Sequence, residues 1–369
     1  MLYPLSNTPR DYAWGSTTLL AALQGRGPSG APEAEIWFGD HPGDPADVPG
    51  GGTLAEVTGG TLPFLLKLLA ADTPLSIQVH PSRAQAQAGF ARETALPSGD
   101  PARNYADDNH KPELLVALSD TFDVLAGLRA VDASAELVAA LGDSAGVRAL
   151  SATLAAGESG PVAAVRWALA GASEAEIHDV IQAALHTEVP GFEESLRMVR
   201  RAAQTYPGDR GLVVALLMNA VQLRAGEAVF VGAGVLHAYQ AGLGVEIMAA
   251  SDNVLRGGLT PKRIDVDELL AILAPTAGPV AIQRPDADAA EVAFPVPVPD
   301  FSLRRVRPGA EGHDVAVRPP AIVLATAGTV ELIAGEDRLT LTPGDAAFVD
   351  GEAAVQLRGP GEVFVAQAG

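Results

Sequence analysis

Apolar and polar residues alternate in short runs along most of the chain, and this spacing changes in the middle. From residue 1 to about 125, and again from Asn219 onward, the apolar runs are broken by Gly, Pro and Asp, which predicts short strands joined by tight turns. Between about Ala130 and Ala220, apolar residues recur at helical spacing in SAELVAALG, PVAAVRWALAG, SEAEIHDVIQAALH and FEESLRMVRRAAQTY. The pattern predicts a mainly β protein with an α-helical insertion.

One strand–turn–strand phrase occurs twice in the chain. LRAGEAVFVGAGVLHAY, residues 223–239, is echoed by LTPGDAAFVDGEAAVQL, residues 341–357, where Val355 takes the place of His237. Many short strands joined by Gly-rich turns are typical of an antiparallel jelly-roll barrel. The echo therefore predicts two related barrels, of which the first carries the histidine.

The change in spacing and the echo together predict four segments. A first, catalytic barrel begins with residues 1–128 and is completed by 220–280, a helical insertion covers 129–219, and a C-terminal barrel without metal covers 281–369. In the last segment, the stretch AFPVPVPDF predicts an edge strand or a linker, because Pro cannot donate to a central ladder.

Composition narrows the class of partner. The 369 residues include 45 Asp and Glu against 25 Lys and Arg, a net charge of -20, which repels nucleic acid and anionic membranes. A small anionic substrate is compatible with this charge, because a few convergent cations and a metal ion reverse the potential locally. Cysteine is absent, which excludes disulfides and thiolate ligands.

The chain also lacks the signals of membrane insertion or secretion. No run approaches the ~20 apolar residues of a membrane-spanning helix, and the start, MLYPLSNTPRDYAWGS, has no basic region followed by an apolar stretch. We therefore expect a cytoplasmic protein with no membrane or nucleic-acid partner. A monomer is expected, with a homodimer as the alternative.

The stretch LSIQVHP is the first candidate for chemistry. Strict alternation places three apolar side chains on one face of a strand and three polar ones, Ser76, Gln78 and His80, on the other. Taken alone, a Q-x-H pair is more typical of a polar strand face or a hydrogen-bonded core histidine than of a metal site.

Two further stretches add candidate ligands. In NHKPELLVAL, Lys111 and Glu113 share a face where an apolar strand begins, although a charged, solvated turn would look the same. His237 follows a Gly-rich turn, and the next strand carries Tyr239 to the same side. Two imidazoles, one carboxylate and one amide suit zinc with an open position, so the predicted ligands are Gln78, His80, Glu113 and His237.

The remaining histidines are interpreted differently. His110 is next to Lys111 but points to the opposite face, which makes it the strongest competitor as a ligand. His178 and His186 fall in the helical region, where we interpret them as surface or packing residues. Because Val355 replaces His237 in the second copy, we predict one zinc ion per chain.

Together, PLSIQVHP, NHKPE, LHAY and GVEIMAASDNVLRGGLTPKRIDVDEL resemble the type I mannose-6-phosphate isomerases, or phosphomannose isomerases, of the cupin superfamily. YAWGS, AEIWFGDHP and LPFLLKLLAA resemble the same family, so the match runs from residue 12 to about 270. The resemblance implies two cupin barrels with a helical domain inserted in the first, and a zinc-dependent enzyme that interconverts mannose 6-phosphate and fructose 6-phosphate. It also implies the same four zinc ligands.

An aldose–ketose isomerisation moves a proton between C2 and C1 through a cis-enediol(ate), so it needs an acid/base group and an electrophile. Lys111, Glu246 and Asp252 are the acid/base candidates, and the sequence does not rank them. The resemblance implies that Arg256 is the active-site arginine, which we expect to stabilise the developing charge.

The phosphate group requires cations. Arg256 and Lys262 fall in one Gly-broken loop, and we expect them to bind it with help from Ser76 and Lys111. Tyr239 is a further predicted contact of the substrate. Without the resemblance, Lys262 would be interpreted as the solvated start of a helix.

Two other functions remain as alternatives. An iron-dependent cupin oxygenase would use two histidines and a carboxylate, but Gln78 and the cations suited to phosphate argue against it. A silent sugar-phosphate sensor would keep the ligands and lose an acid/base group. No G-x-G-x-x-G pattern supports a nucleotide-binding domain.

Overall fold

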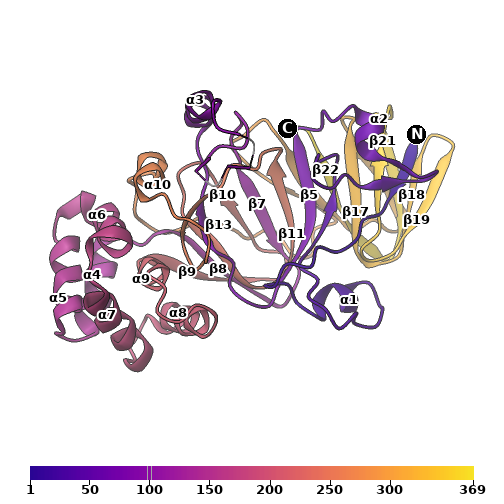
Figure 1. Ribbon diagram of the computed structural model, residues 1–369. Coiled ribbons are helices and arrows are strands. Elements are labelled where there is room, and N and C mark those ends of the chain that lie inside the picture. Colours follow the sequence, from indigo (N-terminus) through magenta and orange to yellow (C-terminus); the bar gives the residue numbers. More distant parts are fainter. Residues whose placement is uncertain (98, 101) are drawn as a thin grey trace.

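The computed structural model describes residues 1–97, 99–100 and 102–369, and it is mainly β with most of its helices in one insertion. In Figure 1 the helices of the insertion lie at one end of the molecule and the yellow C-terminal strands at the other, with the first barrel between them. This arrangement confirms the predicted fold class. Within the described residues, no helix is long and apolar enough to cross a membrane.

A 10-stranded sheet forms the first barrel. Its longest strand, β11 (His237–Ala249), pairs with four others, β5 (Phe64–Ala71), β6 (Ile77–Val79), β7 (Glu113–Ala117) and β8 (Thr121–Leu128). Leu66, Leu68, Val245 and Ile247 from paired strands are fully buried, so the barrel wall is held by apolar packing. The other strands of the sheet are β2 (Glu35–Phe38), β9 (Met218–Arg224), β10 (Ala228–Val231), β12 (Leu255–Gly258) and β13 (Ile282–Gln283).

The helical insertion leaves the barrel after β8 and returns at β9, and these two strands pair with each other. Ser173 caps helix α7 (Glu174–His186) through a capping box with Glu176, as the S-x-x-E pattern predicts. The insertion comprises α4 (Val131–Ala140), α5 (Ala145–Leu154), a 3-10 turn (Gly157–Ser159), α6 (Gly160–Arg166), a π-helical turn (Trp167–Gly171), α7 (Glu174–His186), α8 (Glu193–Thr205) and α9 (Gly211–Leu216). The other helices are α1 (Leu19–Leu23), α2 (Leu54–Thr58), α3 (Arg83–Glu93) and α10 (Val266–Ile272).

Two sheets pack face to face in the C-terminal part. Val323 and Val363 from the first sheet and Leu332 and Leu357 from the second share one apolar core. The 6-stranded sheet contains β1 (Leu2–Leu5), β20 (Ala346–Val349), β17 (Ala321–Gly328), β22 (Gly361–Gln367), β15 (Ser302–Val306) and β14 (Glu291–Phe294), and the 4-stranded sheet contains β16 (Gly309–Ala316), β21 (Ala354–Gly359), β18 (Val330–Ala334) and β19 (Asp337–Leu341). A small ribbon, β3 (Asp47–Val48) and β4 (Gly52–Thr53), completes the strands. The Pro-rich stretch begins in β14, which lies at the edge of its sheet.

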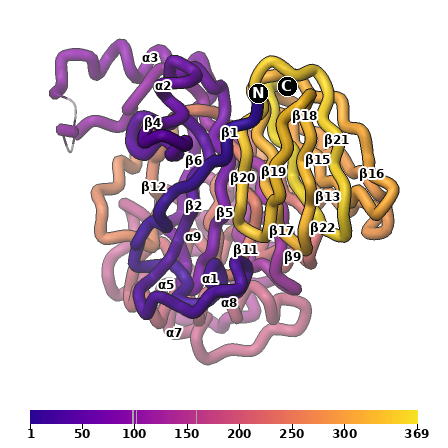
Figure 2. The backbone as a smooth tube through the Cα atoms, turned by 90° about the vertical axis from the view of Figure 1, so that its right-hand side faces the viewer, coloured from indigo at the N-terminus to yellow at the C-terminus, as the bar shows by residue number. Residues whose placement is uncertain are grey.

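The two barrels are joined in two ways. Strand β1 pairs with β20, so the N-terminal strand lies in the sheet of the C-terminal part, as Figure 2 also shows. One apolar cluster spans both barrels, with Leu66 and Val245 from the first and Phe301 and Phe364 from the second. The division of the chain at residues 128, 219 and 280 stays a prediction.

Candidate metal centre

Strand β11 brings the predicted metal ligands to one place. His237, its first residue, lies opposite Gln78 of β6, and Met248 near its other end lies opposite Glu113 of β7. Ile77 and Val79 are fully buried on the apolar side of β6, and Gln78 lines the hollow on the other side. The strand is shorter than the stretch LSIQVHP predicts, but its alternation is as predicted.

His80, Glu113 and His237 form a cluster of possible metal ligands, with one ligand atom of each within 4.8 Å of the others. Nε2 of His80 lies 3.1 Å from Oε1 of Glu113, and Nε2 of His237 lies 3.4 Å from Oε2. Tetrahedral zinc with bonds of about 2.1 Å holds its ligand atoms roughly 3.4 Å apart. These separations therefore fit a zinc ion with little movement of the side chains.

Backbone carbonyls orient both imidazoles. Nδ1 of His80 lies 2.7 Å from the carbonyl of Asn253, and Nδ1 of His237 lies 3.1 Å from that of Val235. A carbonyl only accepts, so each Nδ1 carries the proton and each Nε2 lone pair faces the cluster. Nε2 of His80 is buried without a hydrogen bond although Glu113 is near, which is the condition of a ligand atom whose partner is a metal.

The protonation states suit metal binding. Burial, and then the charge of Lys111, lowers the pKa of His80 to about 4, so this imidazole is neutral. Burial opposes the ionisation of Glu113, but Lys111, His80 and His237 outweigh it and hold the pKa of this carboxyl well below its usual range. A neutral imidazole and an ionised carboxylate are the forms that bind a metal ion.

Two charged residues of the hollow, Glu35 and Lys67, were not among the predicted site residues. Nζ of Lys67 lies 3.5 Å from Glu35 and 3.1 Å from Glu246. Burial alone would lower the pKa of Lys67, but the two carboxylates raise it. A lone lysine inside the apolar run FLLKLLAA is itself a signal, because a buried ammonium requires carboxylate partners.

Glu246 has the titration behaviour of an acid/base group. Burial raises the pKa of this carboxyl to about 7, although the charge of Lys67 opposes the shift. Glu246 lines the same hollow as Gln78, Glu113 and His237. A buried carboxyl that titrates near neutral pH beside a metal cluster can accept and return a proton.

Three predicted substrate contacts also line the hollow. Lys111 donates to Oε1 of Glu113 at 2.6 Å, and the Tyr239 hydroxyl donates to Oε2 at 3.1 Å. Burial, and then the charges of Glu113 and Glu246, raises the pKa of Tyr239 well above its usual value, so the phenol keeps its proton. Ser76 accepts from Nε2 of Gln78 at 3.4 Å, which leaves the amide oxygen for the metal.

The remaining predicted residues lie outside the lining of this hollow. Arg256 of β12 is opposite Gln78, and its charge lowers the pKa of Lys262, so the two cations are neighbours. Within the described residues, no carboxylate pairs with either of them. Asp252 accepts from Nε2 of His41 at 3.1 Å, and this hydrogen bond lowers its pKa, which makes it a weaker base than Glu246.

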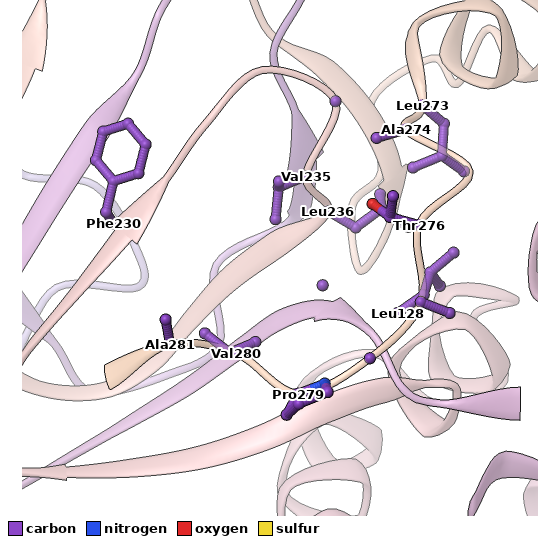
Figure 3. A pocket seen from close by; sticks show the side chains of 14 residues that line it. Leu128, Phe230, Val235, Leu236, Leu273, Ala274, Thr276, Pro279, Val280 and Ala281 are labelled. Atoms are coloured by element: carbon purple, nitrogen blue, oxygen red, sulfur yellow. The ribbon is translucent and has the colours of Figure 1, made fainter. Parts of the chain in front are cut away.

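A second cavity, of about 290 Å³, lies behind the turn that precedes His237 (Figure 3). Val235, Leu236, Leu128 and Val280 contribute to its apolar lining, and none of its lining residues carries an ionisable group. This cavity offers no ligands for a metal ion and no acid or base. The candidate ligands Gln78, Glu113 and His237 and the carboxyl of Glu246 line the first hollow instead.

A cluster of possible metal ligands near a buried carboxyl with a raised pKa, inside a β-barrel, is typical of a metal-dependent enzyme. A family model for the type I phosphomannose isomerase catalytic domain matches residues 2–131. The chain is 35% identical to the mannose-6-phosphate isomerase of Escherichia coli strain K12, over 97% of each chain. It is 29% identical to that of Bos taurus, over 97% of this chain and 95% of the relative.

Solved structures indicate the same family as these sequence relatives. A mannose 6-phosphate isomerase bound with zinc and yttrium superposes with a TM-score of 0.90 at 33% identity, covering 100% of this chain and 99% of that one. A zinc-bound mannose 6-phosphate isomerase superposes with a TM-score of 0.89 at 32% identity, with the same coverage. The chain belongs to the mannose-6-phosphate isomerase family, which confirms the resemblance in its sequence, and it is an isomerase.

Proposed function

We propose that this chain interconverts mannose 6-phosphate and fructose 6-phosphate with one zinc ion per chain, by proton transfer between C2 and C1 through a cis-enediol(ate). The observation that carries the proposal is the position of Glu246, whose pKa is raised to about 7, in the same hollow as the ligand cluster. Catalytic carboxyls of this kind are tuned toward neutral pH by burial.

The donor set favours zinc. His80, Glu113 and His237 offer two imidazole nitrogens and one carboxylate, and the amide oxygen of Gln78 is the fourth ligand. When bound, zinc supplies Lewis-acid stabilisation to the sugar oxygens on which negative charge develops. Since Gln78 adds no charge, the site keeps a net positive charge toward an anionic sugar.

Glu246 is the acid/base group in this proposal. It takes the proton from one of the two carbons and returns it to the other, while Lys67, 3.1 Å away, stabilises its ionised form. Lys111 is engaged with Glu113 at 2.6 Å and serves as a cation and hydrogen-bond donor. Asp252, which accepts a hydrogen bond from His41 and lies outside the lining of the hollow, orients the substrate instead of moving the proton.

The phosphate is proposed to bind outside the hollow. The hollow measures about 50 Å³, which is room for only a few water-sized groups. The reacting end of the sugar enters beside Ser76 and Tyr239, and the phosphate stays at the mouth with Arg256 and Lys262. Arg256 and Lys262 are neighbouring cations with no carboxylate partner among the residues that the structure describes, in a chain of net charge -20, and this supports the assignment.

The test is a coupled assay that follows fructose 6-phosphate formation from mannose 6-phosphate by zinc-loaded protein. Oxygen uptake is measured in parallel with the iron-loaded protein. Turnover of the phosphosugar without oxygen uptake is expected. Folded, zinc-loaded protein that binds the sugar phosphate without turnover would support a sensor, and oxygen consumption would support an oxygenase.

A further inference from the structure

The carboxylate of Asp300, in the C-terminal part just before β15, reaches across to the first barrel. Its Oδ1 accepts from Nη2 of Arg83 at 2.8 Å, and its Oδ2 accepts from Nε2 of His110 at 2.8 Å. Nη2 of Arg83 and Nε2 of His110 are themselves 2.9 Å apart. One carboxylate therefore holds two nitrogen groups together, and the imidazole N–H points toward Asp300.

The two partners of Asp300 flank the metal ligands along the chain. Arg83 follows His80 by three residues, and His110 precedes Glu113 by three. The first of these connections is stiff, because Ser82 caps α3 through a capping box with Gln85. A displacement of Arg83 therefore also displaces the backbone of His80, and a displacement of His110 also displaces that of Glu113.

The position of Asp300 is set by its own burial and by that of its neighbour in the chain. Its side chain is 6% exposed, and the next residue, Phe301, is fully buried in the apolar cluster shared by the two barrels. Leu114, next to Glu113 in β7, belongs to the same cluster. The carboxylate is thus anchored by the packing between the barrels.

We infer that Asp300 is a positioning residue for the metal centre: the C-terminal barrel, in which Val355 takes the place of His237, supplies a carboxylate that holds the segments bearing His80 and Glu113 in place. This inference rests on the metal site of the proposed function. It gives the second barrel a role in metal affinity. Groups outside the ligand set that orient ligands typically change affinity by about 10–100-fold when removed.

The experiment measures zinc transfer from the protein to a chromophoric chelator, for the full chain and for Asp300→Asn. Asparagine keeps the size of the side chain but loses the charge and one acceptor. Zinc release about tenfold faster is expected. The matched control is Asp314→Asn, on the exposed face of β16, where the same change leaves the rate at that of the unaltered chain.

A spectroscopic readout separates positioning from loss of stability. With Co²⁺ in place of zinc, Asp300→Asn should shift the visible absorption bands, because they report ligand geometry, while Asp314→Asn should not. His110→Ala removes one of the two hydrogen bonds that Asp300 accepts, so this variant should also release zinc faster. The double variant should add little to Asp300→Asn, because both changes break the same clamp.

The outcomes are distinct. If the unaltered chain binds zinc but both Asp300→Asn and His110→Ala release it at the unaltered rate with unchanged cobalt bands, this inference is wrong and the proposed function stands. If the unaltered chain binds no zinc, both fail. Should Asp300→Asn not fold, His110→Ala decides by the same criterion.

Discussion

The carboxylate of Glu246 and the ammonium of Lys67 lie 3.1 Å apart inside the first barrel, and both side chains are buried. If either side chain were buried without the other, desolvation would favour its uncharged form. Together they keep a lysine charged and a carboxyl titratable near neutral pH beside the ligand cluster. This pair supports the assignment of Glu246 as the group that moves the proton.

Glu246→Gln should keep the fold and the zinc and lose turnover. The amide has nearly the same shape but cannot accept the proton, so we expect kcat to fall by at least about a hundredfold. The coupled assay and zinc analysis are made on the same sample. Glu311→Gln, on an exposed part of β16, is the control and should be fully active. A variant within threefold of full activity would remove Glu246 from the mechanism.

The activity should depend on pH through Glu246. Its pKa is raised to about 7, and the ionised form is the base, so kcat/KM should rise as pH increases through about 7 and level off above it. Well below pH 6, the rate should fall about tenfold per pH unit. A flat profile between about pH 5.5 and 8 would contradict this titration.

His237→Ala should remove the zinc and abolish turnover while the barrels stay folded. The core around the site is apolar and does not depend on the metal, so circular dichroism should change little. Metal analysis by mass spectrometry gives the zinc content. His178→Ala, which changes an exposed residue of α7, should keep both zinc and activity. Full zinc in His237→Ala would show that this histidine is not a ligand.

Gln78→Glu should keep stoichiometric zinc and lose activity. A carboxylate is the better zinc donor, but it cancels the positive charge that the metal presents beside Glu113. We expect turnover to fall about tenfold or more, or at least about 1.4 kcal/mol of transition-state stabilisation. Unchanged turnover with full zinc would mean that the charge of this ligand has no effect on catalysis.

Arg256→Lys should retain zinc but lose kcat/KM by about tenfold or more, because an ammonium cannot reproduce the planar fork that a phosphate or an oxyanion contacts. Steady-state kinetics with mannose 6-phosphate measure the change. Arg338→Lys, an exposed residue of β19, is the control. Near-normal kinetics in Arg256→Lys would exclude Arg256 from substrate binding and charge stabilisation.

Much of the site could be predicted because its residues sit on regular strands. Alternation in LSIQVHP fixes the side of Gln78, and the K-P-E spacing fixes that of Lys111 and Glu113. The role of Lys67 was missed because its partners, Glu35 and Glu246, lie 32 and 179 positions away along the chain. Such a network forms only when the strands pair.

The clamp at Asp300 could not be predicted for the same reason. Asp300 is separated from Arg83 by 217 positions and from His110 by 190, and no local pattern marks it. Alternation predicts that His110 points to the face opposite Lys111, and in the structure its Nε2 lies 2.8 Å from Oδ2 of Asp300. What it contacts there depends on how the two barrels pack.

We propose that one zinc ion in the first barrel supports the isomerisation, and a titration of metal-free protein with zinc measures this dependence. Metal-free protein is reloaded with measured amounts of zinc, and the conversion of mannose 6-phosphate to fructose 6-phosphate is followed at each step. We expect that turnover rises linearly with bound zinc and reaches its plateau at one zinc per chain. Full turnover in metal-free protein, or a plateau that requires two tightly bound zinc ions per chain, would contradict it.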